Sequence, residues 1–273
     1  MSGKLYVVGT PIGNLGDATE RMVETLKSVD FIAAEDTRVT LKLLNHFEIK
    51  KPMVSYFEHN IRQRGEEIIN RILSGENCAV VSDAGMPLIS DPGEDLVRLA
   101  YENGIETTVV PGPTAFSCAL VLSGLTVKRF SFEGFLSMNK NSRSEHLSSL
   151  KNEERTMVFY EAPHKLKSTL KDLQSAFSDG RRISIVKEIT KLHESVFRGT
   201  IGEAVAYFEE NEPRGEYVLV VDGKTQEKRE YTLEEAVEEA KKLVSEGISK
   251  TDASKTAAKL YGFKKSDIYK ELN

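Results

Sequence analysis

Short apolar runs alternate with amphipathic segments through the first half of this 273-residue chain, and this alternation restricts the folds open to it. The segments between the runs include residues 18–28 and 65–73, and in the second of these the isoleucines follow helical spacing. Strands buried on both faces and separated by helices predict a parallel sheet with helices on either side. The expected strands are residues 5–8, 31–34, 53–57, 79–82 and 107–110.

Beyond Gly124 the pattern changes, because two expected strands near residues 182–198 follow each other without a helix between them. This favours a mixed sheet in the second half. Its expected strands are residues 129–136, 156–161, 182–189, 194–198 and 216–221, and its expected helices are 144–150, 165–177 and 201–210.

The last fifty residues differ again. Residues 226–230 form a polar linker, and Thr232 followed by Glu235 is typical of a capped helix start. Helices are expected at 233–245, 250–261 and 265–272, which makes a helix-turn-helix-like unit or, alternatively, a helical appendage packed on the body. We therefore expect an N-terminal α/β domain at 1–118, a C-terminal α/β domain at 119–223 and a helical, partly basic extension at 224–273.

Composition excludes several classes of protein. No window approaches the roughly 18 unbroken apolar residues of a membrane span, and the N-terminus lacks the pattern of a signal peptide. The most apolar stretch, residues 115–122, is expected to be a buried helix. Cys78 and Cys118 have no metal-ligand neighbours, so a small apolar core role is expected for both. A cytoplasmic protein without a membrane or metal site follows.

Net charge is −5, which taken over the whole chain argues against nucleic-acid binding. The end of the chain is different, because residues 247–273 hold six lysines against three acidic residues, a net of +3. A chain with segregated charge can be acidic overall and still present a basic face.

Glycine- and proline-rich loops follow three of the expected strands in the first half. The loop 9–15 (GTPIGNL) lacks the G-x-G-x-x-G spacing of dinucleotide sites, and Pro11 removes an amide that could face a pyrophosphate. In the loop 82–93 (SDAGMPLISDPG), Asp91 is expected to cap a helix that Pro92 begins. The loop 111–115 (PGPTA) ends the fifth strand. Together they predict one concave wall for a ligand held mainly by backbone contacts.

Six motifs in order resemble the ribosomal RNA small subunit methyltransferase I family, within the tetrapyrrole methylase superfamily of class III methyltransferases. They are residues 9–15, 35–38 (EDTR), 82–93, 111–115, 159–164 (FYEAPH) and 187–194 (KEITKLHE). The resemblance spans roughly residues 4 to 222. Family members usually carry Arg at Lys187, so here the charge is kept but the planar guanidinium is lost.

The resemblance implies a two-domain tetrapyrrole-methylase-like fold, a homodimer, and S-adenosylmethionine held between the domains. It also implies 2′-O-methylation of a cytidine ribose in the decoding region of 16S rRNA, in the small ribosomal subunit. The residues expected to hold the cofactor are Pro11, Ser82, Asp83, Ala84, Gly85, Pro87, Ser90, Pro111, Gly112, Thr114, Ala115, Phe135 and Tyr160. Those expected to contact RNA are Asp36, Arg38, Lys255, Lys259, Lys264 and Lys265.

Methyl transfer to a ribose hydroxyl requires alignment and removal of a proton from a weak acid. We expect Glu188 to be the proton acceptor or an anchor for the ribose, with Lys191 steering a phosphate. In an extended segment these two side chains point to opposite faces unless the chain turns between them. The alternatives are an exposed ion pair for Glu188 and Lys191, a helix cap for Asp36, and core packing for Tyr160, Phe135 and Phe159.

Two other functions remain open from the residues alone. One is a methyltransferase acting on a tetrapyrrole or another small molecule, which needs neither the EDTR segment nor the basic tail. The other is a ribosome-binding assembly factor that keeps a cofactor fold without catalysis.

Overall fold

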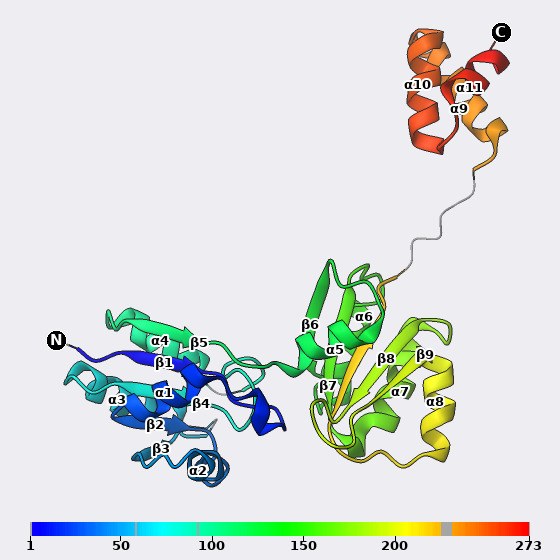
Figure 1. Cartoon of the computed structure of the whole chain (residues 1–273). Helices are drawn as coiled ribbons and strands as arrows, with labels where there is room; N and C mark the ends of the chain where they lie inside the picture. Colours follow the sequence, from blue (N-terminus) through cyan, green and yellow to red (C-terminus); the bar gives the residue numbers. More distant parts are fainter. Residues whose placement is uncertain (1, 58, 92, 225–230, 273) are drawn as a thin grey trace. The chain divides into compact units, whose positions relative to one another are not determined.

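A computed structural model describes residues 2–57, 59–91, 93–224 and 231–272 of the chain (Figure 1). Its compact units are residues 1–224 and residues 225–273. The first unit holds two five-stranded sheets, and the second consists of helices.

The first sheet is entirely parallel, with strand order β3-β2-β4-β1-β5. Three of its strands, β1, β2 and β4, are buried runs of mostly apolar residues, as a sheet covered on both faces requires. The expected parallel sheet is therefore confirmed. The strands are β1 (Leu5–Val8), β2 (Phe31–Ala34), β3 (Met53–Ser55), β4 (Cys78–Val81) and β5 (Thr107–Val110).

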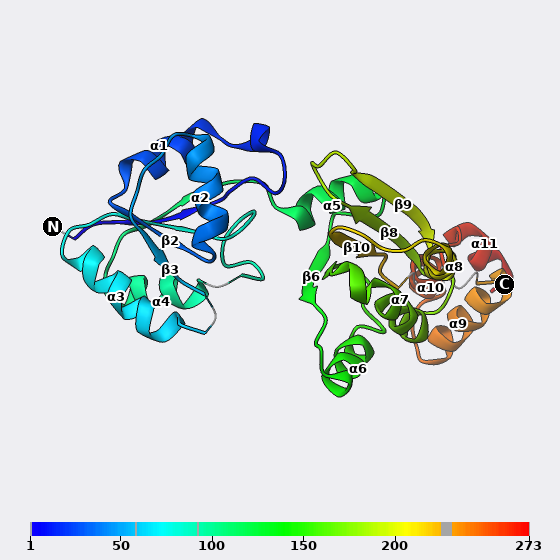
Figure 2. The same cartoon turned by 90° about the horizontal axis from the view of Figure 1, so that it is seen from below.

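Helices cover both faces of this sheet, as Figure 2 shows. Alternate strand residues explain the two layers: Leu5 and Val7 join a core with α3 and α4, whereas Val8 joins a core with α1 and α2. The helical elements of this part are η1 (Leu15–Asp17), α1 (Glu20–Ser28), α2 (Thr37–His46), α3 (Ile61–Leu73) and α4 (Glu94–Glu102).

The second sheet is mixed, with strand order β6-β7-β10-β8-β9, and only β6 and β7 run parallel. This confirms the expected mixed sheet. The helices α6, α7 and α8 cover one face, and α5 packs on the other. The strands are β6 (Phe130–Phe135), β7 (Thr156–Glu161), β8 (Arg182–Lys187), β9 (Ser195–Thr200) and β10 (Tyr217–Val221), and the helices are α5 (Ala115–Ser123), α6 (Lys140–Ser149), α7 (Pro163–Phe177) and α8 (Ile201–Glu210).

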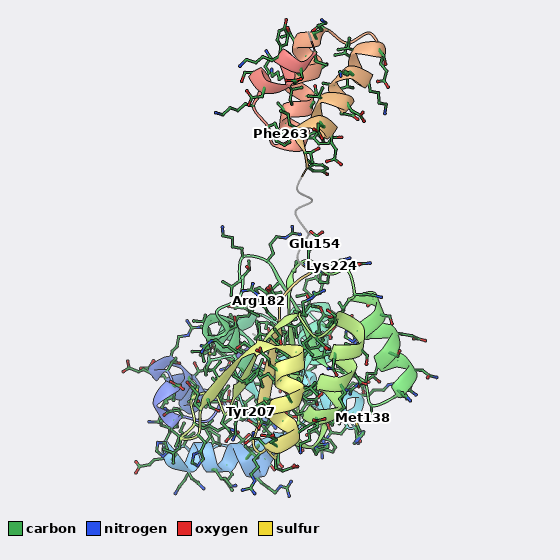
Figure 3. The ribbon with its side chains drawn as sticks, turned by 90° about the vertical axis from the view of Figure 1, so that its right-hand side faces the viewer. Met138, Glu154, Arg182, Tyr207, Lys224 and Phe263 are labelled. Carbon is green, nitrogen blue, oxygen red and sulfur yellow. The ribbon has the colours of Figure 1, made fainter. Side chains whose placement is uncertain are left out.

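Polar contacts hold the end of the first unit to the rest of that unit, and two of the residues involved, Arg182 and Lys224, are labelled in Figure 3. Arg182 at the start of β8 pairs with Asp222 just after β10, with 2.9 Å between Nε and Oδ2. Lys224 donates to the side-chain oxygen of Asn152 at 2.8 Å. These contacts hold the chain to the body up to Lys224.

The second unit packs α9 (Leu233–Ser245), α10 (Lys250–Tyr261) and α11 (Lys265–Glu271) around a small core. Most of that core is alanine, with Ile268 as its largest fully buried member and Phe263 packed against it (Figure 3). Thr232 closes a reciprocal capping box with Glu235 at the start of α9, as the sequence predicts. The expected linker 226–230 lies outside the described residues.

Several expectations about local structure are wrong. Asp91 does not cap α4: Gly93, at φ 132°, precedes the helix, and the expected role of Pro92 lies outside the described residues. The reason is that left-handed residues at Leu88 and Ser90 fold the loop back before the helix begins. The apolar helix α5 is only partly buried, because it packs on the sheet through one side and leaves Val121 82% exposed.

Candidate functional site: a cavity at the carboxyl ends of the strands

A cavity of about 520 Å³ opens where the loops after β1, β4 and β5 meet strands of the second sheet. Its volume lies within the range typical of small-molecule sites. The strand order places β1 and β4 side by side at the centre of the first sheet, where open α/β sheets bind ligands. The lining residues that the sequence predicts for the cofactor are Ala84, Gly85, Ser90, Thr114, Ala115, Phe135 and Tyr160.

Close backbone contacts bring these loops together. Thr10 donates its amide to the Gly85 carbonyl at 2.8 Å, and Gly85 donates back to Thr10 at 3.1 Å. A Cβ atom on Gly9 would lie 2.6 Å from the amide nitrogen of Gly112, so only glycine allows this approach. The glycine-rich sequence of the loops is therefore a requirement of their packing.

The other residues expected at the cofactor lie elsewhere on the same loops. Pro11, Ser82 and Asp83 line a smaller hollow of about 210 Å³ beside α2. Pro111 and Gly112 line a shallow groove that also includes Thr190. Pro87 is buried.

One wall of the cavity is aromatic. The ring of Tyr160 on β7 lies 5.5 Å from that of Phe135 and 5.1 Å from that of Phe132, both on β6. The Tyr160 hydroxyl accepts the amide of Phe116 at 3.2 Å, which fixes the ring, and burial raises its pKa. Phe135 is 56% exposed, so its face is open to a planar ligand group. Phe159, in contrast, lies in the core.

The residues that line this cavity include three carboxylates, Asp91, Glu161 and Glu216, and the imidazole of His164. Burial, reinforced by the negative charge of Glu35, raises the pKa of Asp91 to about 6, while a hydrogen bond from Ser82 opposes the shift. Three carboxylates without a lining Lys or Arg disfavour a phosphate-bearing ligand and favour a cation.

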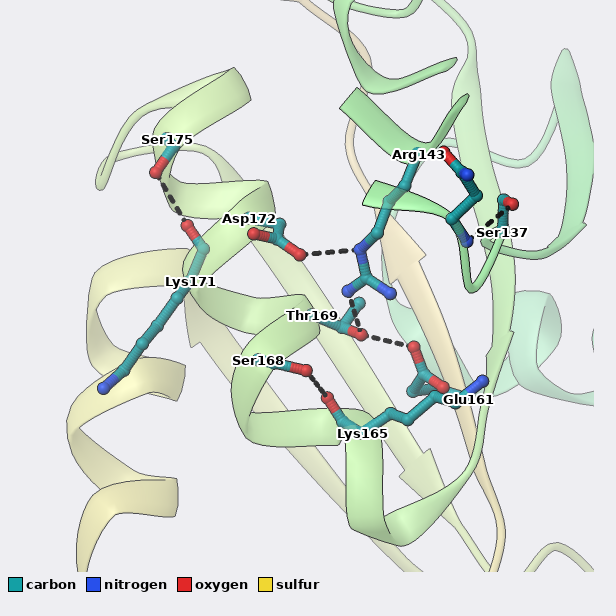
Figure 4. Close-up of polar contacts among 10 residues, drawn as sticks. Ser137, Arg143, Glu161, Lys165, Ser168, Thr169, Lys171, Asp172 and Ser175 are labelled. Carbon is teal, nitrogen blue, oxygen red and sulfur yellow. Dashed lines mark hydrogen bonds and ion pairs between the residues drawn. The ribbon is translucent and has the colours of Figure 1, made fainter. Parts of the chain in front are cut away.

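A buried polar network holds Glu161 at the end of β7 (Figure 4). One carboxylate oxygen accepts the Ala162 amide at 2.9 Å, and the other accepts the hydroxyl of Thr169 on α7. Arg143 on α6 donates to that hydroxyl at 2.7 Å and to Asp172 at 2.6 Å. Glu161 is 4% exposed and Thr169 is fully buried. Buried hydrogen bonds therefore fix the position of the Glu161 carboxylate.

The carboxylates of Glu35, Asp36 and Asp83 form an acidic ridge at the ends of β2 and β4. The Asp83 carboxylate accepts the Asp36 amide at 3.1 Å, and Glu35 accepts the Asp83 amide at 3.3 Å. Burial raises the pKa of both Glu35 and Asp83. Asp36 caps α2 and forms an ion pair with Arg38, and hydrogen bonds from Arg38 lower the pKa of Asp36 to about 2. The helix cap, which was the alternative role for Asp36, is confirmed.

Glu188 and Lys191 lie on the same side of a turn between β8 and β9. Glu188 adopts a left-handed φ of 51°, and the Lys191 amide donates to the Glu188 carbonyl at 3.0 Å, so the chain does turn between them. Lys191 Nζ lies 3.0 Å from the Glu188 carboxylate and 2.7 Å from that of Glu216. The Glu216 amide also donates to Glu188, at 2.9 Å.

These contacts decide the charge states of the pair. Burial raises the pKa of Glu188, but hydrogen bonds from the Glu216 amide and from Lys191 outweigh it, so the net pKa is lowered. Burial lowers the pKa of Lys191, but its two carboxylate partners outweigh that effect and raise it. Both groups are therefore ionised near neutral pH.

The tail lysines expected to contact RNA are all exposed: Lys255 and Lys259 lie one turn apart on α10, and Lys264 and Lys265 lie at the start of α11. Residues four apart share one side of a helix, so Lys255 and Lys259 form a pair of adjacent charges. This arrangement is compatible with a phosphate-binding face.

The part of the chain that the structure describes was searched for metal-binding groups and for membrane-spanning helices. It contains no group of three or more His, Cys, Asp or Glu side chains placed to hold a metal ion. Within the same residues, every helix is too short or too polar to cross a bilayer. Cys78 is buried and Cys118 is partly buried, and both are free thiols.

The sequence did not indicate the acidic lining. Glu161 belongs to a quoted motif and ends a strand, which was a usable signal, since strand ends gather at binding sites. Glu216 and Tyr217 gave no such signal, because only the pairing of β10 with β7 and β8 brings them to the cavity.

Comparison with known proteins adds independent information. Residues 4–205 match the family model for tetrapyrrole (corrin/porphyrin) methylases. A Synechocystis protein named ribosomal RNA small subunit methyltransferase I is 48% identical over 98% of this chain and 96% of its own. A Thermotoga maritima protein of the same name is 50% identical over 222 residues, which is 81% of this chain and 99% of that relative. A uroporphyrin-III-C-methyltransferase structure from Thermus thermophilus shares the fold, with a TM-score of 0.58, 20% identity and coverage of 81% and 94% of the two chains.

Proposed function

The chain belongs to the ribosomal RNA small subunit methyltransferase I family, and on that premise we propose that it methylates the 2′-oxygen of a cytidine ribose in 16S rRNA. The decoding region of the small subunit is the proposed location of that cytidine. The family is S-adenosylmethionine-dependent.

The lining of the large cavity is the observation that supports this function most. S-adenosylmethionine carries a sulfonium cation and an ammonium group, together with a planar adenine. Asp91 and Glu161 supply negative charge, and Tyr160 with Phe135 supplies an aromatic wall. The residues present therefore fit this cofactor, and the Ala115 amide at the start of α5 suits one of its remaining polar groups.

When bound, the cofactor supplies an electrophilic methyl group. The chain must then orient the ribose oxygen and stabilise the negative charge that develops on it. We assign the second task to Lys191, whose ammonium stays protonated between two carboxylates. Glu188, whose lowered pKa makes it a weak base, suits an anchor for the ribose better than a proton acceptor. The proton that the ribose hydroxyl loses on methylation then passes to solvent water.

Contacts to the RNA are assigned to charged groups away from the cavity lining. Arg38 is highly exposed beside the acidic ridge, and the lysines of α10 and α11 are exposed on the second unit. Cationic side chains of this kind bind phosphates without reading sequence. The proposed homodimer is supported by exposed apolar residues on α5 and on β5, Val121 and Val109 respectively.

Transfer of tritium from labelled S-adenosylmethionine to small ribosomal subunits tests the proposal. We expect label in 16S rRNA, and digestion to nucleosides should recover it in 2′-O-methylcytidine. Label in a base or in another nucleoside would refute the proposed position. Label only in an added tetrapyrrole would support the small-molecule alternative, and no transfer to either, with subunit binding intact, would support an assembly factor.

A further inference from the structure

The smaller hollow of about 210 Å³ lies on the opposite side of the cofactor loops from the large cavity. Pro11 and Gly13 line the hollow, whereas Ile12 between them lines the cavity. In the same way, Ser82 and Asp83 line the hollow and the next two residues line the cavity. The two spaces therefore share one wall, made by the loops that the Thr10–Gly85 bridge joins.

Two hydroxyl groups at the hollow lack a partner within the described chain. Thr10 after β1 is 2% exposed and Thr40 on α2 is 3% exposed, and both residues line the hollow. Neither Oγ1 atom makes a hydrogen bond with any described residue. Since burying a hydroxyl without a partner is unfavourable, two at one place indicate that a polar ligand edge completes them.

Apart from Ser82 and the Asp83 carboxylate, the remaining lining is apolar, with a cation at its rim. Pro11, Leu15, Val39 and Leu43 supply the apolar surface, and Leu15 and Val39 are 44% and 36% exposed. Lys42 is exposed at the rim and has no ion pair with any residue that the structure describes, and Arg38 lies one turn earlier on α2. An apolar slot with hydroxyls inside and cations outside matches a nucleobase joined to a phosphate.

We propose that this hollow binds one pyrimidine-sized base of the RNA strand, next to the nucleotide whose ribose faces the cofactor. The base edge bonds to the hydroxyls of Thr10 and Thr40, and the attached phosphate lies against Lys42 and Arg38. This inference rests on the proposed RNA substrate and names the part of the chain that selects the strand. A free phosphate would not need the apolar surface.

Steady-state methylation of small ribosomal subunits by the full-length chain tests this assignment. Thr40→Val removes one hydroxyl at nearly constant volume, and Val39→Phe fills the hollow from its rim. We expect each to raise KM for subunits about tenfold, which corresponds to about 1.4 kcal/mol, while the Kd for S-adenosylmethionine stays within about twofold. Leu41→Phe is the matched control, because Leu41 is exposed on the same helix and lies outside the hollow.

The outcomes separate this inference from the proposed function. Unchanged KM for subunits in both variants, with wild-type methylation intact, would overturn the base site alone. A raised Kd for S-adenosylmethionine would also overturn it, because the hollow would then belong to the cofactor. Absence of RNA methylation by the wild-type chain would refute the function itself, and thermal melting of each variant checks that the fold is retained.

Discussion

Asp91 holds a carboxylate in a partly buried cavity wall, where burial raises its pKa to about 6 from an ordinary value of 3.8. The charged form is therefore unfavourable in the folded protein, and its cost appears as pH rises from about 4 to about 6. A cationic cofactor needs that charged form. We predict that affinity for S-adenosylmethionine, measured by calorimetry, falls as pH drops from about 7 to about 5.

Asp91→Asn should remove most of this pH dependence and lower affinity about tenfold at neutral pH. It should leave the free energy of unfolding at neutral pH unchanged or higher, because a poorly solvated charge is removed. Asp267→Asn, in the second unit, is the control. An unaltered pH profile in Asp91→Asn would assign the titration to another group.

Thr169 is the link between Arg143 and the cavity carboxylate of Glu161. Thr169→Val would leave the guanidinium and the carboxylate each without one partner in a buried place. We predict a loss of about 1–3 kcal/mol in the free energy of unfolding, measured with urea, and weaker cofactor binding. Thr169→Ser keeps the hydroxyl and should lose much less; equal losses in the two variants would mean that packing, not the hydrogen bonds, matters.

At the scale of residues, the sequence predicted the loops of the site better than its charges. Gly85, Ser90 and Thr114, which the family resemblance and the loops after the strands predict at the cofactor, line the cavity, and their contact with the cofactor stays a prediction. Glu216 was missed because its place depends on long-range pairing of β10. The capping role expected of Asp91 failed because left-handed residues within its loop were not apparent from their side chains.

The turn that joins β8 to β9 depends on a close approach by a neighbouring segment. Gly215 has φ +83°, and a Cβ atom there would lie 2.6 Å from the Glu188 carboxyl carbon. Gly215→Ala should displace the Glu188–Lys191 pair and cost at least about 1 kcal/mol of stability, measured by thermal melting. Methyl transfer should fall by more than the stability loss explains.

Gly180 provides the matched control for that substitution. A Cβ atom on Gly180 would meet nothing within 4 Å. Gly180→Ala should therefore be close to neutral in both stability and activity. Equal effects at the two glycines would remove the special role of the turn.

Elements were predicted well wherever a periodic apolar pattern continued, as in α8, α9 and α10, whose bounds agree with expectation. The predicted ends of helices and strands were less accurate. The helix α3 begins at Ile61, four residues before the expected start, and β3 ends at Ser55, two residues before its expected end. Strand length depends on neighbouring strands, and β3 is an edge strand with one partner. Exposure of α5 was missed because its composition is apolar on every side.

The whole molecule consists of two compact units with separate cores. A chain ending at Lys224 should therefore fold and bind S-adenosylmethionine as the full chain does. Methylation of small subunits should fall severalfold, because the exposed lysines of α10 and α11 are lost. Calorimetry and tritium transfer measure the two effects, and unchanged methylation would refute an RNA-binding role for the tail.

The Thermotoga relative is informative about this division. Its alignment spans 222 residues and nearly all of its own length, close to the size of the first unit. The division of the first unit itself at residues 118 and 119 stays a prediction.

The large cavity takes its walls from both sheets of the first unit. Any ligand that binds there and not to the unfolded chain shifts the folding equilibrium of that unit by mass action. At a concentration one hundred times its Kd, the gain is about 2.7 kcal/mol, a sizeable share of the stability of an ordinary domain. The concentration of the cofactor therefore shifts the fraction of the first unit that is folded.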